Sequence, residues 1–462
     1  MRFSTFGLVI FSALGSSRAL APANVTWSNC PDTTGVECAT VQVPLDWADE
    51  SKGMIPIALS RVPAKTPQRE GYMFFNPGGP GGSGTEFVQN LGPIIQFILG
   101  RGMEIISWDP RGIAGSGPNI TLFSGEADYE AFWNPLYGKG HLGAHGNLTI
   151  TSDVDFIMTQ VSAFDGIAQS LNQKMIERNG DLLKYVGTCA VVRDLVYLVD
   201  SVYGQGTDVN LYGISYGTVI ATYLTQMFPD RVGRVIIDGV LDPEKYGNNI
   251  PMKWAEADVY DVDFALKSWT EACAGSKKCP FSNQNDTSST LLTKIDTILN
   301  TAIRSLCHKW TSRAVERLPQ KINKPPKNVV LVLGNMGDPI TPYYSARRLA
   351  SSDQLGTKAR LVLLKSIGHS TLSNNSTCIT DVVKKFIAGT PPDDAGNDDA
   401  DVTCDIEQTI FGPVPSAWQQ FQFNQTHDEP TTSSNSPSGA TRFGASYSLF
   451  FLFASAALLM LR

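Results

Sequence analysis

The sequence lacks an excess of positive charge and contains few histidines. Its 462 residues carry 37 Lys and Arg against 44 Asp and Glu, a net charge of −7, and only 5 histidines. Nucleic-acid binders need a basic face, so this balance argues against that class of protein. No Cys-x-x-Cys pair occurs, so a zinc site has no support, and we expect neither a metal nor a cofactor. The 42% hydrophobic residues favour a globular enzyme over a disordered chain.

The apolar runs near the two ends are shorter than the roughly 20 residues that a membrane-spanning helix needs. Residues 6–14 follow Met1-Arg2 and precede small residues ending at Ala19, which is the order of a secretory signal peptide over residues 1–19. Residues 449–461 form a 13-residue apolar tail after the small residues Ser438-Gly439-Ala440. This order is typical of a glycolipid (GPI) anchor signal; a short tail anchor and an unprocessed tail are the alternatives. We therefore predict a protein that is secreted or attached to the outer cell surface through a C-terminal lipid.

Eight cysteines are an even set in a chain with an export signal, which favours disulfides. Pairing of neighbours predicts three bridges and leaves a fourth by elimination, although spacing alone does not determine connectivity: Cys30–Cys38, Cys273–Cys279, Cys378–Cys404 and Cys189–Cys307. Seven possible N-glycosylation sites agree with a secreted surface: Asn24, Asn119, Asn147, Asn285, Asn374, Asn375 and Asn424.

Apolar, β-branched runs alternate with helical patterns along most of the chain. The predicted strands are residues 39–44, 55–62, 72–75, 104–108, 209–213, 232–237, 329–333 and 361–364. The predicted helices are residues 189–202, 217–227, 345–350 and 381–388. Several strands are continuously apolar, as in a parallel sheet that is buried on both faces. The alternation predicts an α/β fold with a mostly parallel central sheet and helices on both faces.

Residues 242–327 interrupt this alternation, because they contain three cysteines and no clear strand. We expect a helical lid over the strand ends, where α/β sheets bind ligands. The predicted core is then residues 20–241 and 328–425, followed by a Ser/Thr-rich stalk and the apolar tail at 426–462. Within the core, residues 393–407 are predicted to form an exposed acidic loop.

A Gly-x-Ser-x-Gly turn lies between a predicted strand and a predicted helix. It is Gly213-Ile214-Ser215-Tyr216-Gly217, and this context distinguishes a nucleophile elbow from a chance match. The tight turn lifts the serine hydroxyl to the N-terminus of a helix, where N–H groups favour developing negative charge. Ser215 is therefore the predicted nucleophile; the alternative is an ordinary turn serine between glycines.

A serine at its normal pKa is a poor nucleophile and needs a base. Among the five histidines only His369 follows a late predicted strand, from which a loop could bring its imidazole to Ser215. The acid is expected between these two residues in the chain. Asp338 follows strand 329–333, and its role would be to hold the imidazole tautomer and stabilise the imidazolium. Asp238, at the end of strand 232–237, is the alternative acid.

A glycine-rich segment, Pro77-Gly78-Gly79-Pro80-Gly81-Gly82, follows the third predicted strand. Glycines let backbone N–H groups face a substrate, so the predicted oxyanion donors are the N–H groups of Gly79 and Tyr216, each worth about 3 kcal/mol. The segment lacks the G-x-x-x-x-G-K-[ST] pattern of a phosphate-binding loop. Asp109 and Arg111, after the next strand, are expected to brace this segment.

Six motifs follow one another along the chain: Gly78-Gly79-Pro80-Gly81, Asp109-Pro110-Arg111-Gly112, Gly213-Ile214-Ser215-Tyr216-Gly217, Asp238-Gly239-Val240-Leu241-Asp242-Pro243, Gly337-Asp338-Pro339 with Thr341-Pro342, and Gly368-His369-Ser370. Taken together, they resemble the motifs of α/β-hydrolases in the proline iminopeptidase and secreted tripeptidyl aminopeptidase group, peptidase family S33. The resemblance covers about residues 30–407.

The resemblance implies an α/β-hydrolase fold, a Ser215–His369–Asp338 triad, a glycine loop at the oxyanion and a lid at residues 242–327. Two departures stand out. Pro77 occupies a place where the family often has histidine, as in its secreted branch, and the lid is shorter than in secreted relatives. The shorter lid leaves substrate selection open.

The expected function is that of a secreted serine exopeptidase, tripeptidyl or prolyl aminopeptidase-like, which releases short N-terminal units through an acyl-enzyme. Its partners would be peptides with a free amino terminus, and carboxylates recognise an ammonium group best. The predicted lid contains five carboxylates, none of which the sequence singles out: Glu256, Asp258, Asp261, Asp263 and Glu271. The alternatives are a carboxylic-ester hydrolase with the same triad and a catalytically inactive binding protein of this fold.

Overall fold

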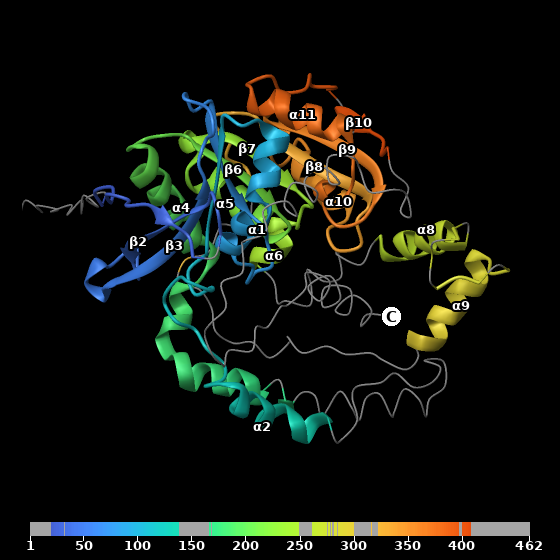
Figure 1. Ribbon diagram of the computed structural model, residues 1–462, viewed down its shortest axis with the longest axis horizontal. Helices are drawn as coiled ribbons and strands as arrows, with labels where there is room; N and C mark the ends of the chain where they lie inside the picture. Colours follow the sequence, from blue (N-terminus) through green and yellow to red (C-terminus); the bar gives the residue numbers. More distant parts are fainter. Residues whose placement is uncertain are drawn as a thin grey trace, which may run out of the picture.

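A ten-stranded sheet forms the centre of the molecule (Figure 1). The computed structural model describes residues 20–137, 166–248, 261–299, 316, 322–396 and 400–407, apart from residues 32, 168, 275, 278, 280 and 284. The strands are β1 (Ser28–Asn29), β2 (Glu37–Pro44), β3 (Met54–Val62), β4 (Gly71–Asn76), β5 (Met103–Trp108), β6 (Val209–Ile214), β7 (Val232–Asp238), β8 (Val330–Gly337), β9 (Ala359–Ile367) and β10 (Val402–Cys404).

The strand order is β1-β2-β3-β5-β4-β6-β7-β8-β9-β10. β1, β2, β3 and β5 pair antiparallel, and every pair from β5–β4 to β9–β10 is parallel. The parallel strands are almost wholly buried, which agrees with their unbroken apolar sequences. The predicted mostly parallel sheet is confirmed, and all eight predicted strands form, extended by up to four residues at their ends.

Helices cover both faces of the sheet, as predicted. On one face α4 (Thr188–Tyr203), α5 (Tyr216–Met227) and α10 (Tyr343–Ala350) share a hydrophobic core with the strands. On the other face α1 (Gly84–Leu99) and α11 (Thr377–Ile387) pack in a second core. Because parallel strands are all entered from one edge of the sheet, the loops that follow them meet at the opposite edge, and this edge receives the candidate site.

The helices α2 (Glu126–Tyr137), α8 (Val262–Ala274) and α9 (Ser288–Leu299) lie outside this layered core (Figure 1), whereas α6 (Pro243–Asn248) packs against α5. α2 comes between β5 and α4, in a stretch for which the sequence analysis proposed no element. The described part of residues 242–327 contains three helices, α6, α8 and α9, joined to turns and irregular segments. α8 contacts the ends of β8 and β9, but its function as a lid stays a prediction.

Three of the four predicted disulfides are present: Cys30–Cys38, Cys273–Cys279 and Cys378–Cys404. The fourth prediction is wrong for Cys189, which is a free thiol buried in the first turn of α4. Elimination assumed that every cysteine is oxidised, whereas Cys189 packs as an apolar side chain in the core. Its proposed partner Cys307 lies outside the described residues.

The acidic stretch 393–407 is only partly an exposed loop, which corrects the prediction. Its residues 402–404 form β10 beside β9, and Cys404 is buried. The Asp401 carboxylate accepts hydrogen bonds from the N–H groups of Leu361 and Ala395, so that this acid holds the loop against the sheet.

None of the helices in the described ranges combines the length and apolar character needed to cross a membrane. The predicted signal peptide (residues 1–19) and the stalk and tail (residues 426–462) lie outside the described residues.

Candidate active site

Ser215 sits in a strained turn between β6 and α5. Its backbone has φ 55° and ψ −119°, a conformation that a residue with a side chain rarely adopts. The flanking glycine is required by close approach, because a Cβ on Gly213 would lie 2.2 Å from the carbonyl oxygen of Gly217. The turn therefore has the geometry of a nucleophile elbow, with the serine at the start of a helix.

Asp338 and His369 form a hydrogen-bonded pair on the loops that follow β8 and β9. Nδ1 of His369 lies 3.2 Å from both carboxylate oxygens of Asp338. The carboxylate is fully buried, whereas the imidazole side chain is 17% exposed. The neutral ring must then carry its hydrogen on Nδ1, which leaves Nε2 free to accept a proton.

Several donors around Asp338 keep it ionised. It accepts hydrogen bonds from the N–H groups of Ile340, Thr341 and Ser370 and from the hydroxyl of Thr341, at 2.6–3.0 Å. Burial by itself would raise the pKa of Asp338, but the imidazole and these donors hold it below its usual value.

The same pair changes the basicity of the imidazole. Burial by itself would lower the pKa of His369, but the Asp338 carboxylate raises it above its usual value of 6.5. A raised pKa makes His369 a stronger base and moves upward the pH at which the imidazole becomes neutral.

A short turn at Asp238 and Gly239 connects the serine to the histidine. The N–H of Ser215 donates to the carbonyl oxygen of Asp238 at 3.0 Å. A Cβ on Gly239 would come 3.3 Å from Cε1 of His369. In the described structure no hydrogen bond joins the Ser215 hydroxyl to the imidazole, a contact that is often long in hydrolases without substrate.

The alternative acid, Asp238, does not take part in the pair. Its buried carboxylate accepts from the hydroxyls of Tyr212 and Thr371 and from the N–H of Thr371. Burial raises the pKa of Asp238 to about 6, and these neutral donors offset that effect only in part. Of the two candidate acids, the structure brings Asp338 to Nδ1 of His369.

The glycine-rich segment lies against the elbow. A Cβ on Gly78 would come 2.8 Å from Cβ of Ser215 and 3.2 Å from the backbone nitrogen of Tyr216, so only glycine allows this approach. The side chain of Asn76 holds the segment by accepting the N–H of Gly78 at 3.1 Å. Neither predicted oxyanion donor, the N–H of Gly79 or of Tyr216, has an acceptor among the described hydrogen bonds. Both are therefore available to donate to a ligand.

Asp109 and Arg111 act in different places, although both were expected to brace the glycine segment. Asp109 accepts from the Ser83 hydroxyl at 2.7 Å and from the N–H of Thr85 at 3.0 Å, where α1 begins. Arg111 does not contact the glycine segment. Its guanidinium forms a fully buried bidentate pair with Asp194 and donates to the carbonyls of residues 44, 45 and 185. That part of the expectation is therefore wrong, because the side chain turns toward α4.

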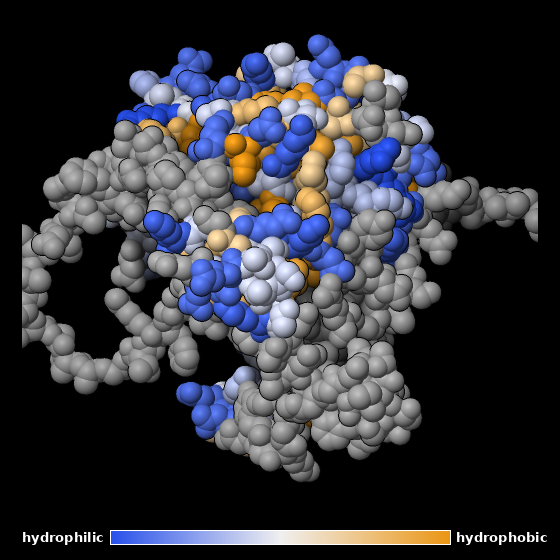
Figure 2. Space-filling view, turned by 90° about the vertical axis from the view of Figure 1, so that its right-hand side faces the viewer, coloured by the Kyte–Doolittle hydropathy of each residue, from blue (hydrophilic) through white to orange (hydrophobic). Residues whose placement is uncertain are grey.

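Large apolar side chains are exposed near the acid and the base. Met336 and Leu372 lie within three residues of Asp338 and His369 respectively, and Phe264 of α8 lies against Gly337. Figure 2 views the molecule from the side of α8 and α9, where apolar patches interrupt the hydrophilic surface. The surroundings of the pair therefore include apolar surface that a substrate side chain could contact.

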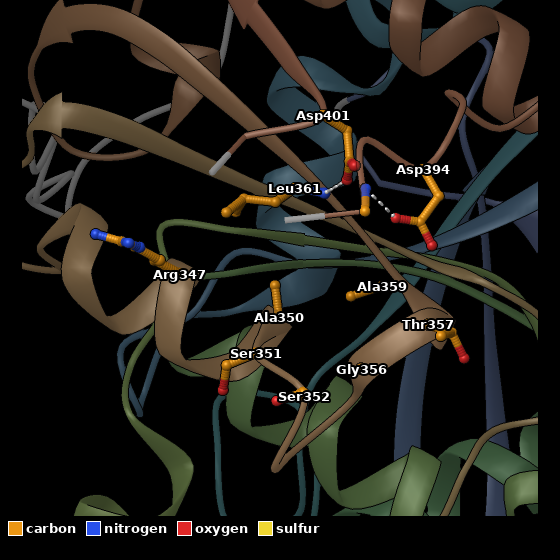
Figure 3. A pocket seen from close by; sticks show the side chains of 11 residues that line it. Arg347, Ala350, Ser351, Ser352, Gly356, Thr357, Ala359, Leu361, Asp394 and Asp401 are labelled. Carbon is orange, nitrogen blue, oxygen red and sulfur yellow. Dashed lines mark hydrogen bonds between the residues drawn. The ribbon is translucent and has the colours of Figure 1, made fainter. Parts of the chain in front are cut away.

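A pocket between the end of α10 and the start of β9 lies away from these residues (Figure 3). It opens at the edge where the parallel strands begin, whereas the serine, the acid and the histidine follow the strand ends. Its carboxylates, Asp394 and Asp401, already accept N–H groups of the adjoining loop and of β9. We assign this pocket no part in the chemistry.

The C-terminal part of the chain matches a family model, that of the TAP-like protein α/β-hydrolase domain, over residues 295–404. This stretch contains Asp338 and His369. A tripeptidyl aminopeptidase of Streptomyces lividans is 26% identical over 277 residues, which cover 57% of this chain and 47% of that protein. The described residues form the fold of an α/β-hydrolase, and the chain is similar in sequence to hydrolases of the S33 type.

Two further relatives of this chain come from Mycobacterium tuberculosis (strain ATCC 25618 / H37Rv). The serine protease Hip1 is 27% identical over 266 residues, covering 55% of this chain and 46% of Hip1. Carboxylesterase B is 27% identical over 265 residues, with the same coverage of each chain. The chain thus spans about half the length of the curated relatives it matches.

Sequence reasoning did not assign three residues that shape the site: Thr341, Asn76 and Asn335. Nδ2 of Asn335 donates to the carbonyls of Gly368 and Ser370 at 2.7 Å and so holds the histidine loop. A signal for Thr341 existed, because an aspartate commonly accepts the N–H groups two and three residues later. The roles of the two asparagines depend on contacts between distant segments and leave no local signal.

Proposed function

We propose that this hydrolase is a secreted serine exopeptidase that releases short N-terminal units from peptides. The observation that carries the proposal is the hydrogen-bonded pair of the buried Asp338 and His369, beside the strained turn of Ser215. An ionised acid, an oriented base and a serine that is not fully buried are the parts that acyl transfer needs. Relatives named as a tripeptidyl aminopeptidase and a serine protease support the peptidase assignment.

In the proposed reaction Oγ of Ser215 attacks the scissile carbonyl carbon. Nε2 of His369 takes the serine proton and then gives it to the leaving amine. The Asp338 carboxylate stabilises the imidazolium, while the N–H groups of Gly79 and Tyr216 stabilise the oxyanion. Water then attacks the acyl-enzyme by the same route, which releases the N-terminal unit and restores Ser215.

Recognition of a free amino terminus needs a carboxylate near the site, and Asp261 is suitably located. It precedes α8, is half-buried and accepts a hydrogen bond from the backbone of Tyr343, five residues after Asp338. Burial raises the pKa of Asp261, and the nearby Asp338 charge adds to this effect. A half-buried carboxylate that is repelled by its neighbour gains from pairing with an ammonium group.

Comparing substrates tests the exopeptidase proposal. We expect the protein to cleave tripeptidyl or aminoacyl arylamides, and acetylation of the substrate α-amine to abolish this cleavage. Ser215→Ala is the control for a contaminating peptidase. Equal cleavage of free and acetylated substrates would contradict the aminopeptidase assignment while leaving the hydrolase assignment intact.

Asp261→Asn tests the amine site. We expect KM for free-amine substrates to rise about tenfold to a hundredfold, the worth of one hydrogen bond to a charged group. Hydrolysis of an uncharged ester should change little. Asp263→Asn, at an exposed residue in the first turn of α8, is the matched control. An equal rise of KM in both variants would show that the loss of one negative charge in this region, and not a direct contact between Asp261 and the amine, causes the effect.

An ester hydrolase is the second candidate, because one relative is named carboxylesterase B. The same triad cleaves esters and amides, which differ chiefly in whether the leaving group needs a proton. A kcat/KM for p-nitrophenyl esters far above that for every arylamide tested would favour this candidate.

We also propose export and attachment through a C-terminal lipid. Three disulfides support export. Among the asparagines of the possible glycosylation sites, Asn24, Asn119, Asn285 and Asn375 are exposed, and a glycan needs an exposed site. Phosphatidylinositol-specific phospholipase C should release the protein from intact cells; protein that stays bound after treatment would argue against the anchor.

A further inference from the structure

Asp238 contacts both the nucleophile turn and the histidine loop, a position that the triad does not explain. Its backbone carbonyl accepts the N–H of Ser215 at 3.0 Å. Its carboxylate accepts the N–H of Thr371 at 2.7 Å and the hydroxyl of Thr371 at 2.8 Å. Thr371 is the second residue after His369. A single buried residue therefore connects the segment that carries the nucleophile to the loop that carries the base.

The surroundings of Asp238 make this connection firm. The carboxylate is fully buried and has a third donor, the hydroxyl of Tyr212 on β6, at 3.0 Å. Besides Thr371, the imidazole of His369 faces this carboxylate from the loop after β9, and Asp338 lies on the far side of that imidazole. Because a buried carboxylate that loses a donor becomes costly, each of these hydrogen bonds resists separation of the two loops.

Asp338 alone does not provide this link. It orients the imidazole through Nδ1, but no hydrogen bond among the described residues joins the Asp338 loop to Ser215. The separation between Ser215 and His369 therefore depends on another element. Displacement of a catalytic group by about 1 Å can cost roughly a hundredfold in rate.

We propose that Asp238 is a positioning residue that sets the separation of Ser215 and His369, with Thr371 as its anchor in the histidine loop. The proposal rests on the serine–histidine chemistry of the proposed function. It gives the second buried aspartate a function that differs from that of the catalytic acid.

Two hydroxyl deletions form a matched test. Thr371→Val and Tyr212→Phe each remove one donor to the same carboxylate oxygen, Oδ2 of Asp238, but only Thr371 belongs to the histidine loop. The measurement is the second-order rate constant for labelling of Ser215 by a fluorophosphonate probe, per mole of folded protein. We expect Thr371→Val to lower this constant about tenfold or more and Tyr212→Phe to lower it much less. Thr371→Ser, which keeps the hydroxyl, should restore the wild-type rate.

Asp238→Asn adds a readout that a merely structural role would not move. The amide keeps the shape, and the two hydroxyls can rotate to accept hydrogen bonds from it. The substitution removes the Asp238 charge, which adds to the effect of Asp338 in raising the pKa of His369. The acid limb of the pH profile of the labelling rate should therefore move to lower pH. This variant also keeps the proposal testable if Thr371→Val does not fold.

The outcomes distinguish a failure of the serine-hydrolase chemistry from a failure of the positioning role alone. Absence of labelling in the wild type would overturn the serine-hydrolase chemistry and this proposal with it. Normal wild-type labelling, with equal losses in Thr371→Val and Tyr212→Phe or an unmoved acid limb in Asp238→Asn, would overturn the positioning role alone.

Discussion

The last residue of β7, Asp238, and the first residue after β8, Asp338, are both fully buried aspartates, yet their pKa values are shifted in opposite directions. Asp338 faces an imidazole that can carry a positive charge, and its pKa lies below the usual value. Asp238 is hydrogen-bonded only to hydroxyls and an N–H among the described residues, and burial raises its pKa to about 6. Burial is the same for both, so the charge of the partner decides which aspartate can stabilise an imidazolium. Neutral donors suit Asp238 to a fixed structural contact.

The largest effect is expected at Asp338. Asp338→Asn replaces the carboxylate with an uncharged amide. The amide no longer holds the hydrogen of His369 on Nδ1, and it provides no negative charge to stabilise the imidazolium. We expect kcat to fall by about 10⁴-fold. The measurement is single-turnover acylation by an activated ester, with Asp238→Asn as the comparison. A smaller loss at Asp338 than at Asp238 would reverse the assignment of the two acids.

A smaller effect, on stability, is expected at Asp238 as the pH rises from 4 to 6. The folded protein holds the proton of this group more tightly than the unfolded chain does, so its contribution to stability is lost as the pH rises through about 6. The rise of the pKa from 3.8 to about 6 corresponds to about 3 kcal/mol at roughly 1.4 kcal/mol per unit. Wild type should therefore lose up to about 3 kcal/mol of unfolding free energy relative to Asp238→Asn over this range.

Urea unfolding at several pH values measures this difference. Asp338, with its lowered pKa, contributes stability that is lost only as the pH falls below 3.8, outside this window. His369, with its raised pKa, contributes stability that is lost only above 6.5, again outside it. Asp381→Asn, at an exposed residue of α11, controls for the loss of one charge. A constant difference between wild type and Asp238→Asn would contradict the buried, tightly protonated carboxylate.

The smallest effect is expected at Thr341. Its hydroxyl donates to Asp338 at 2.6 Å and lies 3.1 Å from Nδ1 of His369. Thr341→Val removes a donor that stabilises the carboxylate charge, so Asp338 becomes more basic and the pKa of His369 rises. We expect the acid limb of kcat/KM to move to higher pH by less than about one unit, the worth of one hydrogen bond. A shift to lower pH, as expected for Asp238→Asn, would mean that the hydroxyl acts on His369 and not on Asp338.

Motifs located the parts of the site that depend on local chain geometry. The Gly-x-Ser-x-Gly turn pointed to Ser215, and a late strand pointed to His369, because a loop after a parallel strand must emerge at the shared edge. The same reasoning left Asp238 and Asp338 as competitors, since both end adjacent parallel strands. β10 escaped prediction because it is three residues long and lies in an acidic run; its order depends on β9 and on the Cys378–Cys404 bridge.

The sequence by itself determined the α/β layering and the tight turn at Ser215, because each follows from the pattern of residues close together in the chain. Only the tertiary structure decided which aspartate is hydrogen-bonded to His369, which acid pairs with Arg111, and that Cys189 is a free thiol. These outcomes depend on side chains from segments far apart in the chain, and on which charges and donors face one another once water has been excluded.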